Sequence, residues 1–106
     1  MAMIEATTET FDSLIDAPYA VVDCYGDMCA ACVMLEPVYT AAASEMSFIR
    51  FGRINISQQY EIAERFGILS MPTLLFFRNG ELAVRAEGSM DRDELNRHIA
   101  DMLYKQ

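Results

Sequence analysis

The order of hydrophobic and polar positions along the chain predicts alternating strands and helices. Residues 8–16 carry apolar side chains at helical spacing and predict a short helix. Residues 19–25 are apolar at nearly every position, which is typical of a central strand that is covered on both faces. A long helical pattern then runs from about residue 29 to 46, with a kink expected at Pro37. Residues 48–56 predict a second strand.

The second half of the chain continues the alternation and adds clear turn signals. Ser57 is expected to cap a helix that ends at Gly67. Residues 73–77 predict a third strand, and Asn79-Gly80 predicts a hairpin into an antiparallel fourth strand. A capping box formed by the residues of 91–94 predicts the start of a final amphipathic helix. This order favours an α/β fold, with a mixed central sheet of four to five strands and helices on both faces.

Length and composition indicate one domain over residues 1–106, because a chain that is 53% hydrophobic can fill a core of this size. The three cysteines are few and odd in number, which indicates reactivity rather than a disulfide scaffold. The first residues show neither a basic head nor a long apolar run, so we expect no secretory signal, no membrane span and a cytoplasmic location.

The net charge of −8 limits the classes of partner. Nucleic acids and anionic lipids bind proteins through Lys and Arg, so neither is an expected partner of this chain. An acidic surface also resists self-association, and we therefore expect a soluble monomer.

Candidate chemistry is concentrated in Cys29-Ala30-Ala31-Cys32, at the boundary between the first central strand and the long helix. Free N–H groups and the helix dipole at this boundary favour a thiolate, which is the attacking form of cysteine. A spacing of three residues places Cys32 on the same helix face as Cys29. We therefore predict Cys29 as the attacking sulfur and Cys32 as the resolving sulfur.

Two other interpretations of the cysteines remain open from the residues alone. The pair could be half of a zinc site, but only Cys24 and His98 could complete the ligand set, one in a strand and the other on the last helix. The pair could also be buried and inert, although a position between strand and helix argues against this. Cys24 itself is expected to be a small core residue, and His98 is expected on a solvated helix face.

With these residues in view, the chain resembles the thioredoxin family over almost its whole length. The motifs that carry the resemblance are Val22-Asp23 before the Cys-x-x-Cys, Pro37, Arg53-Ile54-Asn55-Ile56, Phe66-Gly67-Ile68, Met71-Pro72-Thr73, Asn79-Gly80 and Gly88. The resemblance implies a thioredoxin fold. It also implies a cis peptide bond before Pro72, which would bring the backbone of Met71 beside the sulfurs to bind an extended substrate.

The resemblance also implies a role for Asp23, which lies in an otherwise apolar strand. A buried carboxylate has a raised pKa or a paired charge. In the family, the aspartate at this position accepts the proton of the resolving cysteine, which is Cys32 here. The alternative is that Asp23 forms an ion pair with a purely structural role. Arg53 occupies a position where the family usually has lysine. We expect its guanidinium to donate two hydrogen bonds to the Asp23 carboxylate and to keep that carboxylate ionised.

Several residues around the sulfurs depart from the family pattern. Ala30-Ala31 replaces the usual Gly-Pro, while Tyr25 and Met28 replace tryptophans. Met28 is expected to contact substrates and Tyr25 to be mainly packing. The positions expected to bind the substrate, with these included, are Tyr25, Met28, Ala30, Ala31, Met71, Pro72 and Gly88.

These observations predict a protein-disulfide oxidoreductase that needs no bound cofactor beyond the reversible Cys29–Cys32 disulfide. By resemblance, its partners are proteins that contain disulfides, and a flavoprotein reductase such as thioredoxin reductase supplies electrons from NADPH. The alternatives are a binding module with incidental cysteines, and a dedicated reductant of one partner enzyme.

Overall fold

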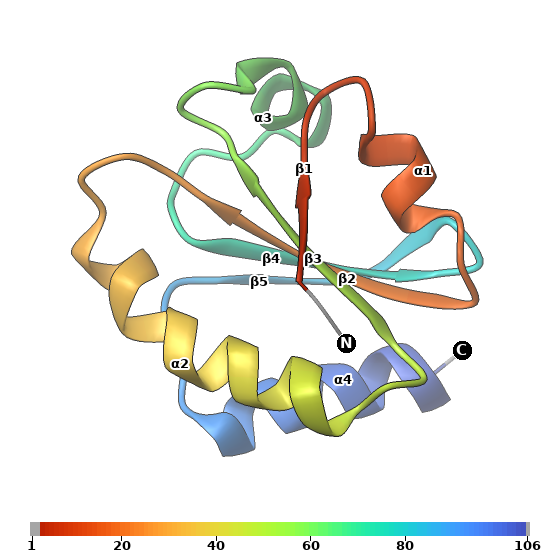
Figure 1. The fold of residues 1–106 in the computed structure, drawn as a ribbon. Coiled ribbons are helices and arrows are strands. Elements are labelled where there is room, and N and C mark those ends of the chain that lie inside the picture. The colour runs from red at the N-terminus through yellow and green to blue at the C-terminus, as the bar shows by residue number, and fades with distance from the viewer. Residues whose placement is uncertain (1–2, 106) are drawn as a thin grey trace.

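Residues 3–105, which the computed structural model describes, form a five-stranded mixed sheet with helices on both faces (Figure 1). The strands are β1 (Ile4–Ala6), β2 (Tyr19–Tyr25), β3 (Arg50–Asn55), β4 (Thr73–Arg78) and β5 (Glu81–Glu87), and the helices are α1 (Phe11–Ile15), α2 (Ala30–Glu45), α3 (Tyr60–Phe66) and α4 (Arg92–Tyr104). The strand order is β1-β3-β2-β4-β5. Strand β3 pairs in parallel with both β1 and β2. Strand β4 pairs antiparallel with β2, and β5 pairs antiparallel with β4. The expected α/β class and thioredoxin fold are confirmed.

The sheet, with β2 at its centre, separates two hydrophobic cores. Helices α2 and α4 cover one face, and α1 and α3 cover the other (Figure 1). Val21 packs with Leu35 and Leu95 from α2 and α4. On the opposite face, Val22 packs with Phe11 and Leu14 from α1. Successive side chains of a strand point to opposite faces, so a strand between two helical layers must be apolar on both. This explains the nearly continuous apolar run, and it makes the buried Asp23 an exception that needs a chemical reason.

The turn and cap signals of the second half are confirmed. Asn79 and Gly80 both have positive φ, 53° and 81°, as the two central residues of a type I′ hairpin turn require. Asp91 and Glu94 form the complete capping box at the start of α4. Gly67 ends α3 in the left-handed conformation.

The structure differs from the sequence-based predictions in one strand, one helix cap and the position of one side chain. β1 was not expected, because a strand of only three residues is too short to show an alternating pattern. Ser57 does not cap α3, whose N-cap is Gln59, and its side chain instead accepts a hydrogen bond from Asp27. His98 is half-buried, with its ring 5.8 Å from that of Phe76, so it does not lie on a fully solvated face.

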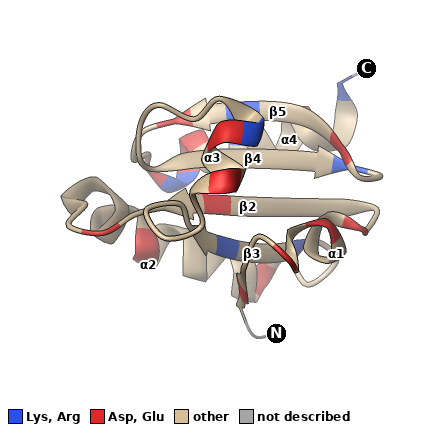
Figure 2. Cartoon of the chain, turned by 90° about the horizontal axis from the view of Figure 1, so that it is seen from above, with Lys and Arg blue, Asp and Glu red and all other residues tan. Residues whose placement is uncertain are grey.

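The acidic residues that give the chain its net charge of −8 are distributed over several elements (Figure 2). Figure 2 shows acidic residues recurring on α1, α2 and α3 rather than gathered on one element. Within residues 3–105, no helix is both long and apolar enough to cross a membrane.

Tyr39 joins α2 to the sheet through its hydroxyl group. The side chain is only 2% exposed, and its hydroxyl lies 3.0 Å from the Val21 carbonyl oxygen of β2 and 2.6 Å from the Gly52 carbonyl oxygen of β3. We expect Tyr39→Phe to lower the free energy of unfolding by about 1–3 kcal/mol, because buried carbonyl oxygens lose a donor. Urea denaturation measures this, with Tyr60→Phe at an exposed position as the control. Equal stability of the two variants would contradict the assignment.

Candidate active site

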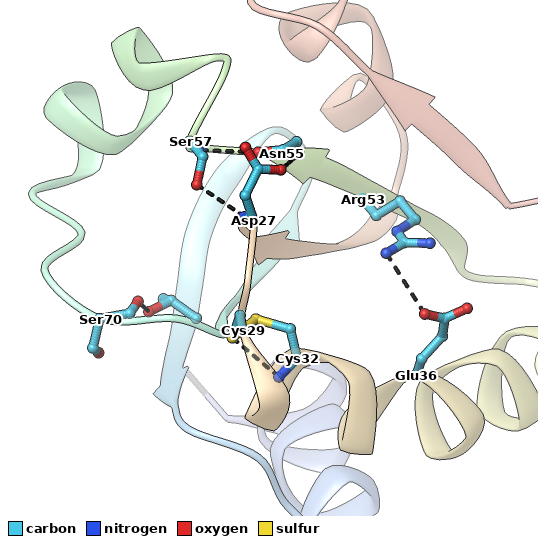
Figure 3. The surroundings of a disulfide bond; sticks show 9 residues. Asp27, Cys29, Cys32, Glu36, Arg53, Asn55, Ser57 and Ser70 are labelled. Carbon is cyan, nitrogen blue, oxygen red and sulfur yellow. Dashed lines mark hydrogen bonds and ion pairs between the residues drawn. A yellow bond between two sulfur atoms is a disulfide. The ribbon is translucent and has the colours of Figure 1, made fainter.

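Cys29 and Cys32 form a disulfide at the N-terminus of α2 (Figure 3). Their Cα atoms lie 5.3 Å apart, and Cys29 is the N-cap residue of the helix. The backbone N–H of Cys32 donates to Cys29 Sγ at 3.1 Å. The same N–H and the helix dipole stabilise negative charge on Cys29 after reduction. The structure therefore brings the two sulfurs together as expected, within a site that favours a thiolate at Cys29.

The two cysteines differ in their access to solvent. Cys29 is half-buried, whereas Cys32 is only 6% exposed. An incoming disulfide can therefore meet Cys29 first, while Cys32 is shielded. This difference supports the assignment of attack to Cys29 and resolution to Cys32.

The loop before Cys29 is held by hydrogen bonds to the last residue of β3 and to the segment that follows it. The N–H of Asp27 donates to Ser57 Oγ at 3.0 Å, and Asn55 Nδ2 donates to Asp27 Oδ1 at 3.0 Å (Figure 3). Met28 then has a φ of 52° and a fully exposed side chain. The loop thus presents a flexible apolar side chain beside the attacking sulfur, where it is available for contact with a substrate.

The segment at Met71-Pro72 lies next to Gly26, in the loop that precedes Cys29. The Met71–Pro72 peptide bond is cis, as the family resemblance implied. The N–H of Gly88, at a φ of 88°, donates to the Pro72 carbonyl oxygen at 2.8 Å. Met71 remains 37% exposed and lies against Gly26, where a Cβ atom would overlap its side chain. The need for glycine at position 26 is not visible in the sequence, because a steric requirement set by a residue 45 positions later leaves no local signal.

A pocket of about 570 Å³ opens beside the sulfurs. Met28, Ala30 and Val33 provide apolar lining, and Glu36 and Arg53 provide charges. Ala30 is exposed and Ala31 is half-buried, so the two alanines differ in how directly a substrate could touch them. Tyr25 also lines the pocket, with its hydroxyl donating to Glu5 Oε2 at 2.6 Å.

Asp23 is almost fully buried, at 2% exposure, in β2. Among residues 3–105, its Oδ1 atom has no hydrogen-bond partner. Burial raises the pKa of Asp23 from 3.8 to about 7, Arg53 opposes this rise, and the carboxylates of Glu36 and Glu5 add to it. A carboxyl group with a pKa near neutrality can both take and return a proton, as exchange at Cys32 requires.

The expected contact between Arg53 and Asp23 is wrong. Arg53 instead makes ion pairs with Glu5 and Glu36, and its guanidinium lies over the Tyr25 ring. Within the described part of the chain, the two hydrogen bonds expected between Arg53 and Asp23 are not formed. Arg53 therefore acts on Asp23 only through its charge, and this does not offset the effect of burial. Sequence analysis overlooked Glu5 and Glu36, which appear in the sequence as ordinary surface carboxylates.

The remaining candidate ligands lie apart from the disulfide. Cys24 is completely buried, and burial raises the pKa of its thiol well above the usual value, so it is an inert core residue. His98 packs against Phe76 on the α4 side of the sheet. In the described range, no group of three or more His, Cys, Asp or Glu side chains is placed to hold a metal ion.

Known proteins are similar to this chain in sequence and in fold. A family model described as Thioredoxin matches residues 2–101. The chain is 34% identical over 93 residues to a thioredoxin of Chlamydia caviae, covering 88% of this chain and 91% of that protein. It is 32% identical over 75 residues to a thioredoxin of Mycoplasma pneumoniae, covering 71% and 74% respectively.

Among solved structures, Chlamydomonas reinhardtii thioredoxin f2 has the same fold with a TM-score of 0.85, at 24% identity, and covers 92% of this chain and 94% of its own. The family match spans almost all of the chain, and its two cysteines are joined in the Cys-x-x-Cys arrangement. The protein is therefore a thiol–disulfide oxidoreductase that works through Cys29 and Cys32, and the chain belongs to the thioredoxin family.

Proposed function

We propose that the protein carries electrons to disulfides in other proteins, as a monomer in the cytoplasm. The observation that carries this proposal is the pairing of a half-buried Cys29, at a helix N-terminus, with a shielded Cys32. Such a pair separates the sulfur that meets the substrate from the sulfur that completes the exchange.

The reduced protein acts in two steps. The Cys29 thiolate attacks one sulfur of the substrate disulfide, which forms a mixed disulfide and releases the first substrate thiolate. Asp23 then accepts the proton of Cys32, whose thiolate attacks Cys29 Sγ and releases the second substrate thiolate. The substrate gains two electrons, and the protein is left with the Cys29–Cys32 disulfide.

The substrate is expected to bind across the edge of the site that contains Met28, Met71 and the cis Pro72. Met28 is fully exposed and Met71 partly so, and methionine side chains adapt to surfaces of different shape. By the family resemblance, we propose that the Met71 backbone, before the cis bond, pairs with an extended substrate chain through main-chain hydrogen bonds. Ala30, Tyr25 and Gly88 complete the proposed contact region, with Ala31 at its edge.

The electrons for regeneration are proposed to come from NADPH through a flavoprotein reductase. No cofactor bound to this chain is needed, because the two cysteines hold the transferred electrons. The test mixes the oxidised protein with NADPH, a thioredoxin reductase and a protein disulfide substrate, and follows NADPH consumption. Turnover that requires all components supports the proposal. Reduction of the protein only by other donors would overturn this choice of donor.

The reduction potential of the pair is expected to be less negative than the roughly −270 mV of an ordinary thioredoxin. The residues between the cysteines affect the relative stability of the dithiol and disulfide forms, and Ala30-Ala31 lacks the usual proline. Equilibration with glutathione buffers measures the potential. Ala31→Pro is the matched variant and is expected to shift the potential to a more negative value. A wild-type value at or below −270 mV would contradict the expectation.

A further inference from the structure

The guanidinium of Arg53 is held by three side chains, none of which is Asp23. Its central carbon lies 4.0 Å from the centroid of the Tyr25 ring. Its Nε atom lies 3.7 Å from Glu5 Oε1, and Nη2 lies 3.9 Å from Glu36 Oε2 (Figure 3). These separations are those of ion pairs and are too long for hydrogen bonds. Two carboxylates and one aromatic ring thus surround the guanidinium of Arg53.

The three side chains that hold Arg53 come from three different elements, and two of them, Tyr25 and Glu5, also contact each other. Tyr25, at the end of β2, supplies the stacking ring and also donates its hydroxyl to Glu5 of β1 at 2.6 Å. Glu36 lies four residues after Cys32, and hence on the same face of α2. Arg53 of β3 therefore links Glu36, in the second turn of α2, to Glu5 of the edge strand β1.

Backbone geometry alone would allow Arg53 to reach Asp23. The two residues are direct partners in the parallel register of β2 and β3. Both Asp23 Oδ1 and Arg53 Nε are buried without a hydrogen-bond partner among the described residues. A direct pairing would satisfy both atoms, and guanidinium–carboxylate pairs are among the strongest hydrogen-bonded contacts. Some other interaction must therefore keep the guanidinium where it is.

We propose that Tyr25, Glu5 and Glu36 are positioning residues that keep the Arg53 guanidinium away from Asp23, so that Asp23 can take the proton of Cys32. An Asp23 carboxylate bound to a guanidinium would be a weak base and would remain ionised through the neutral range. This positioning role rests on the proposed function, in which Asp23 accepts the proton of Cys32.

Other groups around Asp23 do not provide an equivalent partner. Tyr39, from α2, directs its hydroxyl to the carbonyl oxygens of the sheet. Cys24 is the next residue of β2, and its side chain lies in the opposite core. The β4 residue paired with Asp23 is Leu74, which carries no charge. Among the described residues, Arg53 is therefore the cation whose charge acts on Asp23.

The test is a double-mutant cycle in which the pKa of Asp23 is measured by NMR titration of its carboxyl carbon. Glu36→Gln and Arg53→Gln are made singly and together. In the presence of Arg53, we expect Glu36→Gln to lower the pKa of Asp23 by roughly one unit or more, because the guanidinium is released toward Asp23. In the Arg53→Gln background, Glu36→Gln removes only the repulsion between the carboxylates of Glu36 and Asp23. We therefore expect the pKa of Asp23 to fall by roughly half a unit or less.

The matched control is Glu45→Gln, which removes a carboxylate from the same helix at a position paired with Arg92. It should leave the pKa of Asp23 unchanged. Equal shifts from Glu36→Gln in both backgrounds would show simple charge repulsion and overturn the proposal, as would the absence of any shift. The pH profile of mixed-disulfide resolution should move down with the pKa. Because the NMR titration needs no turnover, it tests the positioning separately from the proposed electron carrier.

Discussion

The Cys29→Ser variant is expected to lose protein-disulfide reduction by more than roughly 10³-fold, because a serine hydroxyl is not ionised at neutral pH and cannot replace the attacking thiolate. The Cys32→Ser variant should still attack, but it should stop at the mixed disulfide. Gel electrophoresis without reductant, followed by mass spectrometry, shows this trapped species on Cys29.

Cys24→Ala is the control for the loss of a thiol, since Cys24 is buried in the core away from the disulfide. This variant should retain activity once its stability has been checked. Undiminished disulfide reduction by Cys29→Ser would contradict the assignment of attack to Cys29. A protein that reduces no disulfide, and binds its partner equally well with and without Cys29, would favour a binding module with incidental cysteines. Turnover restricted to one partner enzyme would instead favour the dedicated reductant.

The second large effect is expected on stability, in the Asp23→Asn variant. The folded state holds the Asp23 proton up to a pKa of about 7, whereas the unfolded chain releases it near 3.8. Between these values the unfolded state binds fewer protons, so the contribution of Asp23 to stability falls as pH rises. A difference of about three pKa units corresponds to roughly 4 kcal/mol. The loss begins above about pH 4 and is nearly complete above about pH 7.

Asn cannot ionise, so the Asp23→Asn variant escapes this loss. Its stability advantage over the wild type should grow by roughly 3–4 kcal/mol between pH 4 and pH 8. Urea unfolding at the two pH values measures the change, and Asp16→Asn at the surface is the control. An advantage that does not grow with pH would show that Asp23 is already ionised in the folded protein at pH 4.

The same variant should exchange disulfides more slowly at neutral pH. Without a proton acceptor, Cys32 must lose its proton to water, and the resolution step should slow by roughly 10²-fold. Initial attack by Cys29 should be much less affected. Stopped-flow measurement of the mixed disulfide separates the two steps, and equal slowing of both would argue against a specific role in resolution.

Sequence analysis predicted most of the fold because its signals are local. The apolar run of β2, the Asn79-Gly80 turn and the capping box at the start of α4 each depend on neighbouring residues. β1 escaped notice because three residues carry too little pattern. The N-cap of α3 was misplaced because Ser57 hydrogen-bonds to Asp27, a residue 30 positions earlier.

The site was predicted less completely, because its electrostatics depend on contacts between distant segments. The cysteine pair was evident from its spacing, and the unusual Asp23 from its apolar strand. The expected partner of Asp23 was wrong because Glu5 and Glu36 compete for Arg53. Their distance from Arg53 in sequence, 48 and 17 positions, hides that competition until the chain is folded.

The pH dependence of Cys29 alkylation in the reduced protein shows whether the N-terminus of α2 makes this sulfur anionic at neutral pH. The rate with iodoacetamide follows the thiolate fraction, and Cys32→Ser isolates the signal of Cys29. We expect the pKa of Cys29 to lie below that of a free cysteine, because Cys29 is the N-cap residue of α2 and the Cys32 N–H points at its sulfur. A pKa at or above the roughly 8.5 of a free cysteine would contradict the account.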